Sequence, residues 1–180
     1  MRGLVKVDEF LGGVSNLCGL IATVAMLLML VNVAFDVMMR YAFNDVSIGM
    51  QELEWHLFSL TFLLGVPFAM RRDGHVRVDI IYESRSDKTK AWINLFGVVL
   101  GVIPFSLLIA YYGYGFTMEA FDLGEGSGDP GGLPYRWVVK SLIPLAAGLT
   151  LVSGLAMFTQ ALRVLLLGET YSTEHKESLA

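Results

Sequence analysis

The run LCGLIATVAMLLMLVNVAFDVMM, Leu17 to Met39, decides the fold class. Its 23 residues include only two strongly polar side chains, Asn32 and Asp36. At about 1.5 Å per residue, a helix of this length reaches about 35 Å, enough to cross the hydrocarbon core of a bilayer. The composition agrees, because 54% of the 180 residues are hydrophobic and only 17% are charged, against about 25% charged residues in soluble domains. The sequence therefore predicts an integral membrane protein.

Three further apolar segments predict an all-α chain with four transmembrane helices in a single membrane domain, residues 1–180. The expected spans are about 17–39, 50–70, 91–116 and 137–167. The second crosses the full thickness only if its helix begins near Met50 and takes Glu52 and Glu54 into its first turns. Span two therefore starts in the polar interface.

Aromatic residues support these boundaries independently of hydropathy. Trp55, Trp92 and Trp137 each lie at an expected helix start, and the run YYGYG, residues 111–115, closes span three. Indole and phenol rings prefer the headgroup level of a membrane. Pro104, inside span three, is tolerable because neighbouring helices can satisfy the carbonyl that a proline leaves without a donor.

The distribution of Lys and Arg predicts the orientation. The two tails and the second loop, residues 71–90, hold ten of the thirteen basic residues, and the other two connections with their flanks hold three. Basic residues are enriched in cytoplasmic segments. We therefore expect both termini and loop 71–90 in the cytoplasm, and loops 40–49 and 117–136 in the periplasm.

The N-terminal segment has two interpretations. Leu4, Val7, Leu11 and Val14 share one helical face, so a short helix along the inner membrane surface is one expectation, and a frayed tail is the other. The apolar run that follows is too long for a signal peptide and has no A-x-A-like cleavage site. We therefore expect this segment to stay in the mature protein.

The third loop is acidic and rich in glycine. It lacks a preceding strand and a Lys at Walker spacing, so it does not predict a phosphate-binding loop. Solvation of a long turn explains its acids, and docking of a basic partner is the alternative. The four docking candidates are Glu119, Asp122, Glu125 and Asp129.

The usual carriers of redox and metal chemistry are sparse. Only one of the three His residues, His56, can lie in a span, so paired imidazole ligands for haem are not expected. His75 and Asp79 stand four apart, but their neighbours do not complete a metal site. Cys18 is the single cysteine, which excludes a disulfide or a paired-thiol centre, and we interpret it as a small core residue. No catalytic, cofactor or metal residue is predicted, and no basic patch suggests nucleic acid.

Charged groups near the ends of spans one and two are a stronger signal. An ionisable group near the bilayer centre costs at least about 2.5–3.5 kcal/mol on insertion scales. Asp36, Glu52 and Glu54 can all reach the interface, and Arg40 lies one turn beyond Asp36. We favour interfacial acids that pair with Arg40 over an ion-coupling site. Gly97 and Gly101 in span three form a G-x-x-x-G motif, a candidate for close helix packing between subunits.

The segment VNVAFDVMMRYAFNDVSIGMQELEWHLFSLTFLLGVPFAMRRDGHVRVD, residues 31–79, resembles a known signature. It is similar to the small membrane subunit (small permease component, DctQ-like) of tripartite ATP-independent periplasmic (TRAP) transporters. The matching residues are Asn32, Val33, Arg40, Tyr41, Phe43, Glu52, Leu53, Gly65, Gly74, His75, Val78 and Asp79. The motif GGLPYRW, residues 131–137, is similar to a subset of that family. Gln51 departs from the pattern, because many members have an acid there, so either Glu52 or Glu54 carries that role.

The resemblance implies a multi-pass subunit of the bacterial cell inner membrane, without enzymatic activity. Its implied partners are a large TRAP permease subunit with the substrate and sodium sites, and a periplasmic substrate-binding protein. Transport would be uptake of an organic acid, driven by an ion gradient, with the small subunit enlarging the fixed part of an elevator. Gly74, His75 and Asp79 would form a structural corner. Two alternatives remain: a self-sufficient four-span homo-oligomeric exporter or channel, and a membrane anchor for a redox enzyme.

Overall fold

The computed structural model describes residues 2–72, 82 and 85–168. Within these residues the chain is helical and contains no strand. The elements in chain order are α1 (Arg2–Ala42), α2 (Ile48–Arg71), α4 (Asp87–Gly97), the π-helix η1 (Val98–Val102), α5 (Ile103–Asp122) and α6 (Trp137–Leu167). Because α4, η1 and α5 follow one another without a gap, they form one long rod. Four rods are therefore long and apolar enough to cross a membrane, as the sequence predicts.

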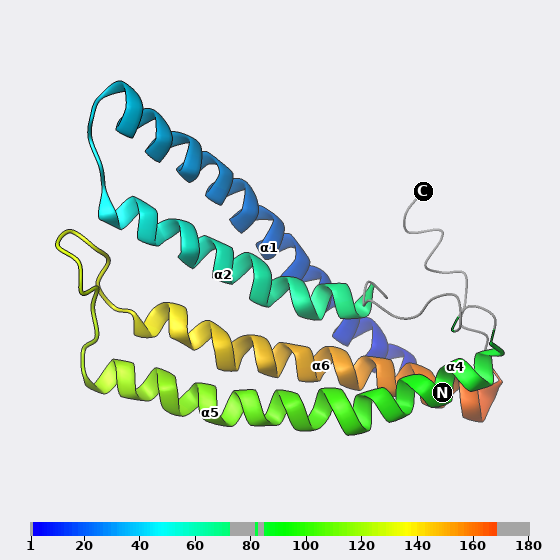
Figure 1. The fold of residues 1–180 in the computed structure, drawn as a ribbon. Coiled ribbons are helices and arrows are strands. Elements are labelled where there is room, and N and C mark those ends of the chain that lie inside the picture. Colours follow the sequence, from blue (N-terminus) through cyan, green and yellow to red (C-terminus); the bar gives the residue numbers. More distant parts are fainter. Residues whose placement is uncertain (1, 73–81, 83–84, 169–180) are drawn as a thin grey trace.

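The four rods form two hairpins (Figure 1). Helices α5 and α6 run side by side, and α2 lies against both α6 and α1. Helix α1 diverges from α5 and α6 toward the end of the bundle that carries the α1–α2 turn and the α5–α6 loop (Figure 1). We call this end, formed by residues 43–47 and 123–136, the loop end. Helix α1 begins and α6 ends at the opposite end.

The N-terminal segment is neither a separate short helix nor a frayed tail, because α1 runs unbroken over 41 residues. At about 1.5 Å per residue this corresponds to about 60 Å, twice the thickness of the hydrocarbon core. Gly12 lies within this helix and packs closely: a Cβ there would meet a guanidinium nitrogen of Arg71 at 3.1 Å. The small residue thus lets the end of α2 approach α1.

Pro104 is accommodated by a π turn. A proline has no N–H to donate and disturbs the helix before it. Here the five residues Val98–Val102 adopt π geometry, and the N–H of Ile103 donates to the carbonyl of Val98, five residues back. Pro104 then occupies the first turn of α5, where its missing donor matters least.

Small residues make the helix contacts. Cys18 is buried with Ala22 and Leu64, which confirms its interpretation as a small core residue. A Cβ on Gly19 would lie 2.3 Å from the Phe68 ring, so that ring packs directly on the α1 backbone. Close approach over small residues is the usual way in which membrane helices associate.

A polar contact adds to this packing. The Ser15 and Ser153 hydroxyls lie 2.8 Å apart and join α1 to α6 where both are buried. Sequence spacing gives no sign of this pair, because 138 residues separate its members.

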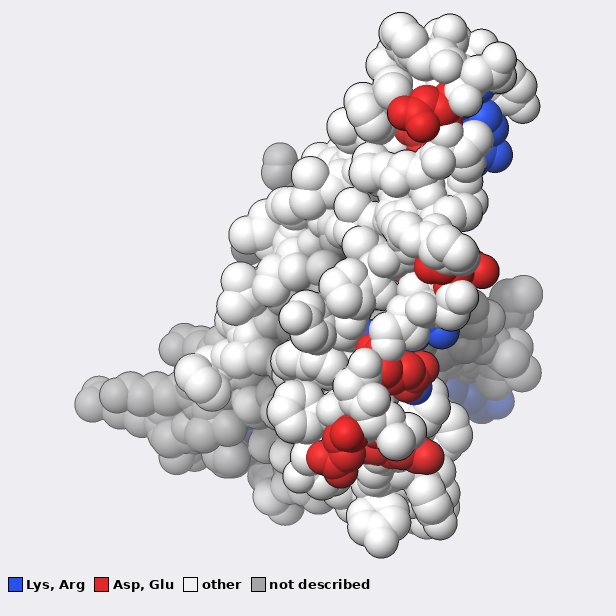
Figure 2. All heavy atoms as spheres, turned by 90° about the vertical axis from the view of Figure 1, so that its left-hand side faces the viewer, with Lys and Arg blue, Asp and Glu red and all other residues white. Residues whose placement is uncertain are grey.

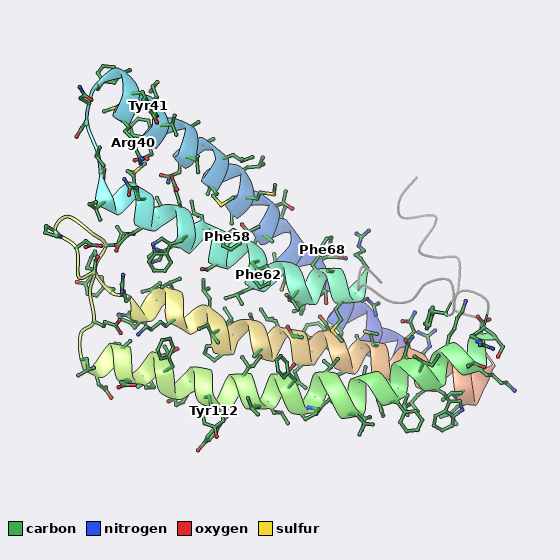
Figure 3. All side chains as sticks on the ribbon, in the orientation of Figure 1. Arg40, Tyr41, Phe58, Phe62, Phe68 and Tyr112 are labelled. Atoms are coloured by element: carbon green, nitrogen blue, oxygen red, sulfur yellow. The ribbon has the colours of Figure 1, made fainter. Side chains whose placement is uncertain are left out.

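Large apolar side chains mostly face outward. In the most apolar window of each rod, only 17–28% of the residues are buried inside the chain. Tyr112 on α5 projects away from the bundle (Figure 3), and Phe58 and Phe62 stack along α2 with ring centroids 6.2 Å apart. An apolar outer surface of this extent fits lipid or a partner subunit.

Helix α5 continues beyond the span expected from the sequence and ends at Asp122. Gly124 has φ +59°, its N–H donates to the Phe121 carbonyl, and the Glu125 N–H donates to the Ala120 carbonyl. This is the Schellman arrangement, in which a left-handed glycine satisfies the last carbonyls of a helix. As a result, Glu119 and Asp122 lie on a helix and not in a loop.

Candidate functional site at the Glu52 cluster

The carboxylate of Glu52 is the polar centre of the loop end. Glu52 lies in the second turn of α2 and is only 6% exposed. Its Oε1 accepts from the Ser127 hydroxyl at 2.5 Å, and its Oε2 accepts from the Leu133 N–H at 2.5 Å. The Arg136 Nη2 donates to Oε1 at 3.4 Å. One side chain therefore ties α2 to the α5–α6 loop and to the start of α6. We call Glu52, Trp55, Ser127, Leu133 and Arg136 the Glu52 cluster.

The two glycines of GGLPYRW shape the loop around this carboxylate, Gly131 through its backbone conformation and Gly132 by leaving space. Gly131 has φ +83°, a backbone conformation that favours glycine. A Cβ on Gly132 would lie 2.2 Å from the Ser127 Oγ and 2.9 Å from the Glu52 Oε2. Any side chain at position 132 would therefore push the loop off Glu52.

Hydrogen bonds within the loop orient its donors. The Ser127 N–H donates to the Leu133 carbonyl at 3.0 Å, which holds the two Glu52 donors side by side. The Ser127 hydroxyl also accepts from the Asp129 N–H at 3.1 Å. The Ser127 hydroxyl thus accepts from the Asp129 N–H and donates its own hydrogen to Glu52, whose carboxylate can only accept.

Arg136 supplies the compensating charge. Its guanidinium carbon lies 5.7 Å from the Trp55 ring centroid, one turn along α2 from Glu52. The backbone N–H of Arg136 donates to the Glu125 carbonyl at 2.9 Å, which fixes the start of α6. A cation beside a desolvated carboxylate reduces the cost of burying that carboxylate.

A second ion pair closes the base of the loop. Lys140 on α6 donates to the Glu125 carboxylate, and its Nζ lies 4.0 Å from the Phe116 ring centroid on α5. Phe121 and Trp137 meet edge to face beside it, with ring centroids 5.4 Å apart. The loop is therefore anchored at its base by the Lys140–Glu125 pair and further along by the contacts of Ser127 and Leu133 with Glu52.

The α1–α2 hairpin has its own polar contacts. Arg40 donates to the Asp36 Oδ2 at 2.5 Å, with the Asp36 side chain 3% and the Arg40 side chain 43% exposed, which confirms the expected pair. Asn32 Nδ2 donates to the Met50 carbonyl at 2.9 Å. The sequence also predicts that Glu52 pairs with Arg40, and this is wrong. Glu52 faces the α5–α6 loop, whereas Arg40 is held on α1 by Asp36.

The structure also distinguishes the two candidate acids of span two. Glu52 is buried within the cluster, whereas Glu54 is partly exposed on another face of α2. The Nδ1 of His56 lies 2.5 Å from the Glu52 carbonyl oxygen, so this ring nitrogen is hydrogen-bonded to the backbone of its own helix. Glu52 is therefore the acid that the fold positions.

The remaining predicted residues are dispersed. Tyr41 is 82% exposed near the loop end of α1, next to Arg40 (Figure 3). A Cβ on Gly65, Gly97 or Gly101 would meet nothing within 4 Å. Gly74, His75 and Asp79 lie outside the residues that the structure describes.

Of the four docking candidates, three are exposed at or near the loop end: Glu119, Asp122 and Asp129. Glu125 is only partly exposed and is paired with Lys140. Figure 2, a view onto this end, shows acidic side chains spread across it with basic ones between them. The surface is therefore acidic in patches.

Sequence reasoning missed Ser127 and Arg136 as partners of Glu52. The available signal was the GGLPYRW motif, which carries Leu133 and Arg136 and whose paired glycines indicate a close backbone approach. In the described part of the chain, no group of three or more His, Cys, Asp or Glu side chains could hold a metal ion.

Four apolar rods, with buried acids held in ion pairs at one end, define a multi-pass membrane protein whose polar groups fasten helices together. The profile of the family described as "Tripartite ATP-independent periplasmic transporters, DctQ component" matches residues 28–164. The chain belongs to this family, and is thus a small permease component of a TRAP transporter. No curated protein matches the chain. Components of this family work with a large permease and a binding protein.

Proposed function

We propose that this chain is the non-enzymatic small subunit that braces a large permease during binding-protein-dependent uptake of an organic acid. An ion gradient, with sodium as the coupling ion, drives this uptake. The chain resides in the bacterial inner membrane with both termini and loop 71–90 in the cytoplasm, so that the loop end faces the periplasm. The family membership carries this proposal.

The state of the buried acids supports a bracing role. Among the side chains that the structure describes, Asp36 and Glu52 are the buried acids, and each is held by an arginine. A group that couples ion flux to transport must exchange its ion during the cycle. The Asp36 carboxylate is instead bound by Arg40 one helical turn away, and the Glu52 carboxylate is bound by the α5–α6 loop and Arg136. Their chemistry suits a rigid body against which a moving part can slide.

The loop end provides the surface for the binding protein. Glu119, Asp122 and Asp129 are exposed there. A group of exposed negative charges increases the rate of association with a positively charged surface. We assign them to a basic patch on the binding protein. Glu125 leaves this set, because its carboxylate is committed to Lys140.

His75 and Asp79 retain a proposed structural role at the corner of loop 71–90. If they fix that loop against the large subunit, His75→Ala reduces the amount of large permease that copurifies. If this variant copurifies with the large permease and supports uptake as the wild type does, the structural role of His75 is excluded. The basic residues of the loop would then act only through their charge, which sets the orientation of the chain.

Reconstitution of the chain alone tests the proposal against the exporter or channel alternative. Proteoliposomes that contain only this chain are expected to show no flux of organic acids or sodium above that of empty liposomes. Flux through the isolated chain would overturn the bracing role. An absorption spectrum of the same sample tests the redox-anchor alternative, for which a Soret band is required.

A further inference from the structure

The exposed side chains of α4 change from cationic to aromatic along one stripe of the helix. Lys88, Trp92 and Phe96 stand four residues apart, so they are neighbours on the helix surface, and all three are exposed. The Trp92 and Phe96 rings lie side by side, with centroids 5.7 Å apart. Ala91, on the side toward α6, is fully buried. We call Lys88, Trp92 and Phe96 the α4 stripe.

The cations at the start of α4 are not neutralised by the acids around them. Arg85, which precedes the N-cap Ser86, is exposed like Lys88. Among the side chains that the structure describes, no carboxylate forms an ion pair with either cation. Asp87, the acid of the first turn, lies four residues before the buried Ala91 and therefore on the side toward α6. The exposed start of the α4 stripe thus carries a net positive charge.

The order of these side chains matches the layers of a membrane surface. Helix α4 begins the rod Asp87–Asp122, which is long and apolar enough to cross a membrane, and it lies at the end of the bundle opposite the loop end (Figure 1). Indole rings prefer the headgroup level, and a lysine can hold its ammonium in the polar layer. Lys88 and Phe96 lie about 12 Å apart along the helix axis. When Lys88 is level with lipid phosphates, Phe96 is therefore among the acyl chains.

This combination of charge and depth favours a lipid over a helix of another protein. A helix that covered the α4 stripe would bury Lys88 and would need a carboxylate at the same depth, with the cost of desolvating both charges. A lipid phosphate meets the ammonium in the polar layer, while its acyl chain lies against the two rings. A zwitterionic headgroup brings its own cation, so the net positive charge favours an anionic headgroup.

We propose that the α4 stripe binds an anionic phospholipid, with its phosphate held by Arg85 and Lys88 and an acyl chain packed along Trp92 and Phe96. In the orientation proposed above, this lipid belongs to the cytoplasmic leaflet. The site is complete without the large permease, so its failure would leave the proposed function intact.

Lys90 provides a control of equal charge for the headgroup contact. It stands two residues beyond Lys88, hence on another side of the helix, and its Nζ lies 5.5 Å from the Tyr82 ring centroid. The isolated chain in detergent is titrated with phosphatidylglycerol and followed by native mass spectrometry. Lys88→Gln is expected to raise the Kd about fivefold, the equivalent of about 1 kcal/mol for one basic residue near an anionic surface. Lys90→Gln should leave the Kd unchanged. Wild-type affinity in Lys88→Gln, or equal losses in both variants, would overturn the proposal.

Trp92 reports whether the acyl chain lies on the stripe. Liposomes of equimolar phosphatidylglycerol and phosphatidylcholine are prepared with bromine, a quencher of tryptophan, on the acyl chains of one lipid or the other. The difference between wild type and Trp92→Phe isolates the Trp92 emission. We expect stronger quenching when phosphatidylglycerol carries the bromine, both for the isolated chain and for its complex with the large permease. Equal quenching by the two lipids would exclude a headgroup site. Protection from both lipids in the complex would place a protein helix on the α4 stripe and contradict the proposal.

Discussion

The carboxylate of Glu52 accepts the backbone N–H of Leu133 at 2.5 Å, although 81 residues separate the two along the chain. Together with Ser127 and Arg136, this contact makes one acidic side chain the link between the two helical hairpins at the loop end.

Removal of the Glu52 charge should release the α5–α6 loop. In Glu52→Gln, one acceptor oxygen becomes an NH₂ donor that faces either the Leu133 N–H or the Ser127 hydroxyl, so one of these donors loses its partner. We expect amide hydrogen exchange across residues 123–136 to accelerate by about tenfold, while exchange in the middle of α6 is unchanged. Glu54→Gln is the control, because Glu54 lies outside the cluster. Equal protection of the loop in both variants would contradict the proposed link.

The fit of Gly132 predicts a second effect at the same place. Gly132→Ala introduces a Cβ that collides with Ser127 and Glu52. Overpacking of this kind costs about 1–3 kcal/mol. Thermal unfolding in detergent should show a lower midpoint for Gly132→Ala than for Gly128→Ala, since a Cβ at position 128 meets nothing within 4 Å. Indistinguishable midpoints would mean that the loop is not seated on Glu52.

Close packing of α1 on α2 gives a matched pair of variants on one helix. Gly19→Ala places a Cβ against the Phe68 ring, whereas Gly13→Ala points into open space. Both gain about 1 kcal/mol of helix propensity, but only the first incurs the steric cost. We expect the free energies of unfolding to differ by about 1–3 kcal/mol, with Gly19→Ala the less stable. The reverse order would exclude the described contact between Gly19 and Phe68.

The three exposed acids, Glu119, Asp122 and Asp129, are expected to increase the rate of association with the binding protein and to leave the stability of this chain unchanged. Glu119→Gln, Asp122→Asn and Asp129→Asn combined should slow uptake at low ionic strength and flatten its dependence on salt, because steering by opposite charge is screened by ions. Unfolding midpoints should stay at the wild-type value. Glu125→Gln should instead lower the midpoint, because it breaks the pair with Lys140. Unchanged uptake kinetics in the triple variant would remove the docking role.

The sequence predicts those features that depend on local spacing. Apolar length indicates the four spans, and the four-residue spacing of Asp36 and Arg40 indicates their ion pair, because residues one helical turn apart are neighbours. Cys18 follows from its apolar surroundings. These predictions agree with the structure because each uses only the geometry of a single helix.

The remaining features depend on contacts between distant segments. The spacing of Glu52 and Arg40 says nothing about a loop that begins 71 residues after Glu52, so the predicted pair was wrong even though the cation beside Glu52 is also an arginine. The π turn before Pro104 is likewise invisible, because the sequence marks the proline but not the way in which the helix absorbs it. The close approach of Gly12 in the unbroken N-terminal helix to Arg71 at the end of α2 is also a contact between distant segments, which local spacing does not predict.

Reconstituted uptake tests the central claim most directly. Proteoliposomes with the large permease, the substrate-binding protein and this chain are expected to accumulate substrate when an inward sodium gradient is imposed. Omission of this chain should abolish accumulation, and this chain without the large permease should transport nothing. Wild-type accumulation without this chain, or transport by this chain alone, would contradict its assignment as a bracing subunit.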